Sequence, residues 1–223
     1  MNLFADTEFF NTGIPKKVAY TLQDADLFYI ENFYTKEEAD ILYTKLLNDT
    51  KWLESKTTVY GKEHNTPRLT AWYGDAGTEY TFSGNKMNPF PWTKDLLFIK
   101  EKVDKEAGVV FNSVLLNLYR TGKDSVGWHR DNEKEFGTNP IIASVSFGET
   151  RPFHLKHKFK KEIEKVIIPL THGSLLIMKG KMQHYWEHQI PKTAKDISPR
   201  INLTFRIIKM CSCQTANDPA TSS

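Results

Sequence analysis

The chain has 223 residues, 39% of them hydrophobic, and a formal net charge of +3, which is typical of one globular domain with a sizeable core. No apolar run approaches the roughly 20 residues that a bilayer span requires, and the first residues lack the apolar core of a signal peptide. We therefore expect no membrane partner and a location in the cytoplasm, or in the nucleus if the cell is eukaryotic.

A first helix is predicted over residues 35–49. Thr35 is a suitable N-terminal cap, and Glu38 completes a capping box with it. Leu42 and Leu46 continue an apolar stripe at helical spacing. This segment is therefore expected to pack one face against a sheet.

A second helix is predicted over residues 91–108, and Gly108 is a typical helix stop. Its apolar positions fall on one side: Leu96, Ile99, Val103 and Ala107. Between the two helices, residues 53–90 are rich in Tyr, Thr, Gly and Lys, and we expect loops and short strands there.

After Gly108 the pattern changes to short β runs separated by turns, which favours a sandwich or small barrel over βαβ units. The predicted class is α+β, with a jelly-roll-like core in 113–209 that the helices of 20–112 buttress. The chain 1–223 is expected to be one domain with a polar tail, 210–223. The predicted strands are 113–119, 141–147, 152–157, 165–170, 174–179, 183–188 and 200–209.

Two of these strands carry polar residues on a single face, because successive strand side chains point to opposite sides. Asn117 and Tyr119 share one face of their strand. Such a face could lie in water on a half-exposed strand. It could instead line the mouth of a barrel, where guanidinium groups match a carboxylate. The last strand has four such residues: Arg200, Asn202, Thr204 and Arg206.

A candidate metal site begins in "SVGWHRDNEKEFG", where His129 and Asp131 project the same way if the chain is extended. A third ligand must come from a later strand, and His184 and His188 are the two candidates. Two histidines and a carboxylate suit non-haem Fe(II) and also catalytic zinc. The polar and basic residues that follow His188 favour an enzyme with a dicarboxylate cosubstrate.

Six motifs together resemble those of the AlkB family of Fe(II)- and 2-oxoglutarate-dependent nucleic-acid dealkylases. They are "NLY" (117–119), "HRDNE" (129–133), "ASVSFG" (143–148), "HGSLLIM" (172–178), "HYWEHQIP" (184–191) and "PRINLTFR" (199–206).

The resemblance implies a double-stranded β-helix (jelly roll) that uses Fe(II), 2-oxoglutarate and O2. It implies His129, Asp131 and His188 as metal ligands. It also implies a set of 2-oxoglutarate contacts: Asn117, Tyr119, Arg200, Asn202, Thr204 and Arg206.

An upstream segment, "TPRLTAWYGDAGTEYTFSG" (66–84), resembles the nucleotide-recognition lid of the subgroup that repairs duplex DNA in animals. Tyr60 stands where that subgroup has an aromatic finger, there a Phe, and Asn132 stands where it has an acidic residue. The implied substrate contacts are Tyr60, Gly61, Lys62, Tyr80, Phe82, Asn132 and Glu133.

Basic residues are expected to hold the nucleic-acid backbone, although a solvated, lysine-rich turn is the alternative for "KHKFKKEIEK" (156–165). The implied contacts are Arg151, Lys156, Lys158, Lys192 and Lys195.

The implied function is oxidative demethylation of 1-methyladenine and 3-methylcytosine in duplex or single-stranded DNA. It is coupled to conversion of 2-oxoglutarate to succinate and releases formaldehyde. We expect a monomer. Two alternatives stay open from the residues: an oxygenase acting on RNA or protein, and a jelly-roll module that binds a ligand without turnover.

Overall fold

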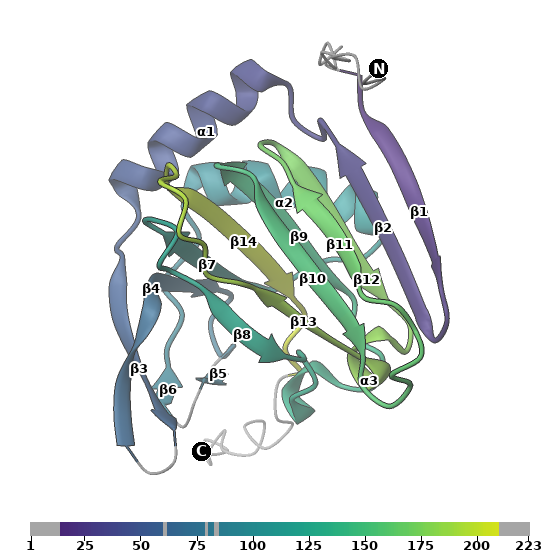
Figure 1. The fold of residues 1–223 in the computed structure, drawn as a ribbon. Coiled ribbons are helices and arrows are strands. Elements are labelled where there is room, and N and C mark those ends of the chain that lie inside the picture. Colours follow the sequence, from purple (N-terminus) through teal and green to yellow (C-terminus); the bar gives the residue numbers. More distant parts are fainter. Residues whose placement is uncertain (1–13, 60–61, 79, 83–84, 210–223) are drawn as a thin grey trace, which may run out of the picture.

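The computed structural model describes residues 14–59, 62–78, 80–82 and 85–209. Within the strands, it describes only the backbone for 55–59, 62–64, 80–82 and 85–87. Antiparallel strands dominate these parts of the chain (Figure 1), as an α+β jelly-roll core requires. The predicted fold class is confirmed.

The larger sheet has eight strands in the order β1-β2-β12-β9-β14-β7-β4-β3 (Figure 1). The β1–β2 hairpin forms one edge and the β3–β4 hairpin the other. The strands are β1 (Lys16–Leu22), β2 (Ala25–Glu31), β3 (Leu53–Val59), β4 (Lys62–Gly74), β7 (Ser113–Tyr119), β9 (Ile142–Gly148), β12 (Ser174–Lys179) and β14 (Arg200–Arg206).

The smaller sheet has four strands in the order β11-β10-β13-β8, and two short strands, β5 and β6, form a separate hairpin. A 3₁₀ turn, η1, follows β8, and a single helical turn, α3, precedes β13. The bounds are β8 (Val126–His129), β10 (Arg151–His157), β11 (Val166–Leu170), β13 (Trp186–Ile190), β5 (Tyr80–Phe82), β6 (Asn85–Met87), η1 (Lys134–Phe136) and α3 (Met182–Tyr185).

Two helices, α1 (Lys36–Asp49) and α2 (Lys94–Ala107), form as predicted. The backbone N–H of Glu38 donates to Thr35 Oγ1, and the Glu38 carboxylate accepts from the Thr35 N–H, so the predicted capping box is present. The predicted apolar side of α2 is buried, and Gly108 ends the helix in a left-handed conformation. In the described part of the chain, no helix combines the length and apolar character of a bilayer span.

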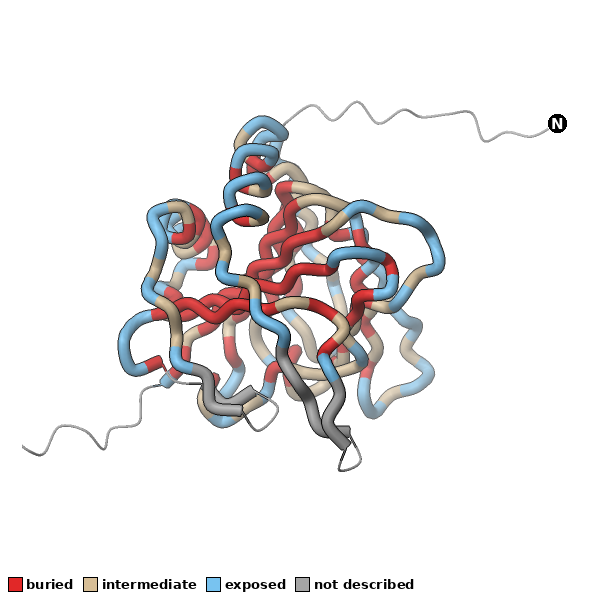
Figure 2. Tube along the Cα trace, turned by 90° about the vertical axis from the view of Figure 1, so that its left-hand side faces the viewer, coloured by how far each residue is buried: buried red, intermediate tan, exposed pale blue. Residues whose placement is uncertain are grey.

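The larger sheet, which contains β14, has an apolar cluster on each of its two faces. Ile201, Leu203 and Phe205 belong to the same apolar cluster as the buried faces of α1 and α2. The opposite face of the larger sheet packs on the smaller sheet through a second cluster that includes Trp186. All residues of β7 and β14 are buried, so a half-exposed strand was the wrong alternative. Figure 2 shows the buried segments, in red, gathered in the middle of the molecule with exposed segments around them.

One local prediction differs from the structure, and three strands were not predicted. Residues 183–185 belong to α3, and only the segment from Trp186 onward is extended. Strand β8 was not predicted, because it has only four residues and includes Gly127. The hairpin of β1 and β2 was not predicted either; β1 is mostly exposed, and it gains its order by pairing with β2.

Replacing Gly108 by Ala should lower the free energy of unfolding by about 1 kcal/mol, because a Cβ is strained at φ +72° although nothing lies within 4 Å of it. Urea denaturation measures the decrease. Gly127→Ala is the matched control, since its Cβ also meets open space and no left-handed φ applies. Equal stability of the Gly108 variant and the wild type would contradict this view of the helix end.

Candidate active site

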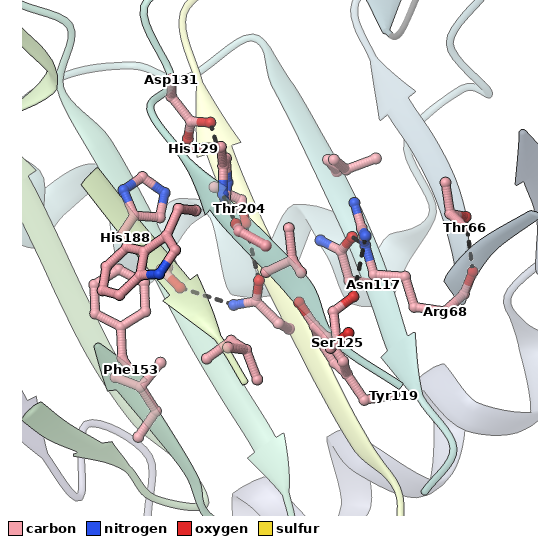
Figure 3. A pocket seen from close by; sticks show the side chains of 18 of the residues that line it. Thr66, Arg68, Asn117, Tyr119, Ser125, His129, Asp131, Phe153, His188 and Thr204 are labelled. Carbon is pink, nitrogen blue, oxygen red and sulfur yellow. Dashed lines mark hydrogen bonds and ion pairs between the residues drawn. The ribbon is translucent and has the colours of Figure 1, made fainter. Parts of the chain in front are cut away.

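A cavity of about 470 Å³ opens between the two sheets. Strands of both sheets line it: β4, β7, β9, β12 and β14 from one and β8, β10, β11 and β13 from the other. Figure 3 shows His129, Asp131 and His188 gathered on one side of Thr204, with Asn117 and Tyr119 on the other. The cavity therefore holds two groups of polar side chains.

Strand pairing brings the two histidines together. His129 on β8 is the direct antiparallel partner of His188 on β13, and their ring centroids are 4.2 Å apart. The Nδ1–H of His129 donates to the carbonyl of Gly127 over 2.8 Å, and its Nε2 lies 3.9 Å from Asp131 Oδ1. Asp131 completes the group: one ligand atom from each residue lies within 4.8 Å of the others.

Asp131 is held through its carboxylate and through its backbone N–H, by two different elements. Arg206 Nη2 on β14 donates to Asp131 Oδ2 over 2.7 Å, and the Asp131 N–H donates to Gln183 Oε1. Burial alone would raise the pKa of Asp131. The guanidinium of Arg206, helped by the two histidines, outweighs burial and lowers that pKa to about 2. The carboxylate is therefore ionised and oriented.

His188 is 4% exposed, and its Nδ1 has no hydrogen-bond partner among the described residues. Burial, followed by the neighbouring His129, lowers the pKa of His188 to about 3. The imidazole is thus neutral at pH 7 and can offer a lone pair to a cation without first losing a proton.

His184, the other candidate for the third position, lies in α3 and not on the strand with His188. Its Nε2 is 3.0 Å from Asn139 Oδ1. The predicted strand 183–188 would place His184 and His188 on one face; this is wrong, because the helical turn rotates His184 away. The structure groups His188, and not His184, with His129 and Asp131.

The second polar group centres on Arg200, which is 1% exposed and is the strand partner of Tyr119. Arg200 Nη2 donates to Ser146 Oγ, whereas its Nε and Nη1 have no hydrogen-bond partner among the described residues. Burial lowers the pKa of Arg200 to about 10, so the guanidinium keeps its charge. A buried cation with two unused donors is suited to an anionic ligand.

A hydrogen-bond chain lies between the two groups. Thr204 Oγ1 donates to Asn202 Oδ1, and Asn202 Nδ2 donates to Ser144 Oγ and to the carbonyl of Val145. Asn117 is the strand partner of Asn202 and accepts from Arg68 Nε. All six residues predicted to contact 2-oxoglutarate line this one cavity.

Several residues of the site were not predicted. Ser144 lines the cavity, and Ser146, which accepts from Arg200, shares its strand face on β9 within "ASVSFG". Arg68 is 6% exposed on β4, in a segment that was predicted as loops and short strands. The alternation of polar and apolar residues in "TPRLTAW" was the available signal for that strand.

The predicted substrate contacts are placed unequally. Glu133 lines the cavity, whereas Asn132 is exposed and is not one of the lining residues. Tyr60 and Gly61 lie outside the described residues. For the others the structure describes only backbone: Lys62 on β4, and Tyr80 and Phe82 on β5.

Four of the five residues predicted to contact the nucleic-acid backbone lie at the surface. Lys156 is partly exposed on β10, where its Nζ is 3.1 Å from Glu187 Oε2 and 4.3 Å from the ring centroid of Trp128. Lys158, Lys192 and Lys195 are exposed.

The structure corrects the predicted role of the fifth residue, Arg151. Arg151 is 1% exposed and donates to the backbone carbonyls of Pro191 and Asp124. A guanidinium inside the protein cannot reach a phosphate at the surface, so the prediction that Arg151 binds the nucleic-acid backbone is wrong.

Residues 26–206 match the family model of the 2OG-Fe(II) oxygenase superfamily. The chain belongs to this superfamily, whose members use Fe(II), 2-oxoglutarate and O2.

Two relatives extend the comparison. The chain is 44% identical over 184 residues to "Alpha-ketoglutarate-dependent dioxygenase alkB homolog 3" of Bos taurus, covering 79% of this chain but only 64% of that protein. It is 40% identical over 184 residues to "DNA oxidative demethylase ALKBH2" of Mus musculus, covering 78% and 77%. The fold of "The structure of OsALKBH1" is similar, with a TM-score of 0.61 and 15% identity over 85% of this chain and all of that chain (100%).

The side chains fit the group that the family implies. Two imidazoles and an ionised carboxylate are the donors that Fe(II) takes in oxygenases of this type. The unused donors of Arg200 suit one carboxylate of a keto-diacid. Both observations come from the geometry of this chain and not from its similarity to others.

Replacing His188 by Ala should weaken Mn(II) binding by more than about 100-fold. Loss of a residue that only hydrogen-bonds to a metal ligand already lowers metal affinity about 10- to 100-fold, and His188 is proposed as a ligand itself. Titration calorimetry with Mn(II), a stable substitute for Fe(II), measures the change. His184→Ala is the control and should bind Mn(II) within about twofold of wild type. Equal weakening in both variants would overturn the ligand assignment.

Proposed function

We propose that the protein is a dioxygenase that removes N-methyl groups from 1-methyladenine and 3-methylcytosine in DNA, with conversion of 2-oxoglutarate to succinate and release of formaldehyde. One observation carries the proposal: two histidines and a carboxylate share a cavity with a buried, incompletely bonded arginine. The name of the mouse relative, a DNA oxidative demethylase, supports the substrate class.

In this proposal His129, Asp131 and His188 hold Fe(II). Arg200 binds the distal carboxylate of 2-oxoglutarate, and the polar side chains between them orient its chain. When bound, the iron and 2-oxoglutarate supply the oxidising chemistry that hydroxylates a methyl carbon in the presence of O2. Those polar side chains are Asn117, Tyr119, Asn202 and Thr204, with Arg206 fixing Asp131.

Contacts within the protein fix the metal-binding side chains before any ligand binds. Arg206 and Asp131 stay paired inside the protein, which fixes the carboxylate before any cation arrives. Phe153, whose ring centroid is 5.1 Å from that of His188, covers one side of that imidazole with apolar surface. An organised site reduces the reorganisation that the reaction requires.

The cavity lining suits a methylated base. Trp128 and Glu133 both line the cavity, so its wall offers an aromatic ring and a carboxylate. The base carries a positive charge after N-methylation, and cation–π attraction and a carboxylate both favour that charge. Methylation on the pairing edge also makes extrusion from the duplex less costly. Tyr60, Tyr80 and Phe82 belong to the same proposal as contacts to the extruded base.

The test is formaldehyde release from a panel of oligonucleotides that carry 1-methyladenine or 3-methylcytosine, in duplex and single-stranded DNA and in RNA. The proposal expects release from DNA that requires Fe(II) and 2-oxoglutarate. Asp131→Ala should abolish it, with the thermal transition recorded as a check on folding. Succinate formation without release from any DNA would reject the substrate class, and absence of succinate would leave only the binding module.

Lys156 and Lys158 are proposed to contact phosphates. Replacing both by Ala should weaken binding to single-stranded DNA and reduce the slope of log Kobs against log salt by about 0.7 for each phosphate that is no longer neutralised. Fluorescence anisotropy over a salt series measures the slope. The charge-matched control is Lys94→Ala with Lys105→Ala on α2, which packs on the opposite face of the larger sheet. An unchanged slope in the first variant would contradict the proposed phosphate binding.

A further inference from the structure

Arg151 is the first residue of β10, and its side chain is buried. It contacts loops next to the end of the cavity that Arg200 lines. Its Nη2 donates to the carbonyl of Pro191 over 2.6 Å and to that of Asp124 over 3.1 Å, and its Nη1 lies 3.5 Å from the carbonyl of Thr121. One guanidinium thus joins the β7–β8 turn to the loop between β13 and β14.

Arg151 and Arg200 share one neighbour. The guanidinium carbons of Arg151 and Arg200 lie 5.7 Å and 5.2 Å from the ring centroid of Tyr119, whose place in the cavity is labelled in Figure 3. Both arginines are 1% exposed. The phenol ring of Tyr119 therefore lies beside two buried positive charges.

Neither of these two charges has a direct ion-pair partner among the described residues. The carboxylates of Asp124 and Glu149 both act on the charge of Arg151, but neither forms an ion pair with it, and that of Asp124 already accepts three hydrogen bonds from Arg120. Arg151 Nε, like two nitrogens of Arg200, has no hydrogen-bond partner among the described residues.

Buried charges of like sign repel one another and lose their hydration, so a pair of them is unfavourable unless an anion completes the site. Burial lowers the pKa of both guanidinium groups, but both remain cations at neutral pH. The excess positive charge at this end of the cavity is a property of two arginines, of which only Arg200 lines the cavity.

We propose that Arg151 is a positioning residue that selects a dicarboxylate over a monocarboxylate keto acid. It adds a second positive charge behind Tyr119. It also fixes the β7–β8 turn and the β13–β14 loop, which adjoin the cavity-lining residues Ser125 and Ile190. This inference rests on the proposed function, because it assigns the selectivity of the 2-oxoglutarate slot.

The test compares two ligands of equal chain length, 2-oxoglutarate and 2-oxopentanoate, by titration calorimetry on the Mn(II)-loaded protein without turnover. Arg151→Met should raise the Kd of 2-oxoglutarate about tenfold, which corresponds to about 1.4 kcal/mol, and change that of 2-oxopentanoate by less than about twofold. Arg151→Lys keeps the charge and should retain the preference for the diacid to within about threefold.

Asp124→Asn provides a variant with the opposite sign. It removes a negative charge that acts on Arg151, so the preference for 2-oxoglutarate over 2-oxopentanoate should increase. A residue with a structural role alone would not produce opposite changes in two neighbouring variants. The Asn variant also keeps the proposal testable if Arg151→Met does not give a folded protein.

A preference that falls in Arg151→Met and rises in Asp124→Asn supports the inference, as does the rise alone where Arg151→Met is unfolded. Equal weakening of both ligands in Arg151→Met, or an unchanged or smaller preference in Asp124→Asn, overturns it. Wild-type protein that fails to bind 2-oxoglutarate, or binds both keto acids equally, would overturn the proposed function itself.

Discussion

The buried ion pair between Arg206 and Asp131, 2.7 Å long, is the contact on which the site depends. Arg206 ends β14 in the larger sheet, and Asp131 follows β8 in the smaller one, so the pair ties the two layers together at the cavity. A buried pair contributes little net stability, but removal of one partner costs about 3–5 kcal/mol. Its value here is orientation: it fixes a carboxylate beside two histidines.

Positive charge is concentrated on one face of β14, where Arg200 and Arg206 lie at opposite ends. Arg206 has an internal carboxylate, whereas Arg200 and its neighbour Arg151 have none among the described ion pairs. This asymmetry separates the two functions of the cavity. One end is balanced and ready for a cation, and the other is complementary to an anion.

Helices and most core strands could be predicted because their signals are local. The capping box at Thr35 and the stop at Gly108 depend on residues within a turn of each other. Strand β8 and the turn α3 could not be predicted, since pairing with distant strands, and not their own composition, decides their conformation. The same holds for β1, which is ordered by the β2 hairpin.

The sequence by itself determined the chemistry of the site, because alternation along a strand already groups Arg200 with the other polar residues of β14. Only the tertiary structure decided which histidine joins His129, since strand register sets His188 opposite it and a helical turn removes His184. It also decided that Arg151 is internal. A side chain's burial depends on the loops that fold over it, and no pattern along the chain records them.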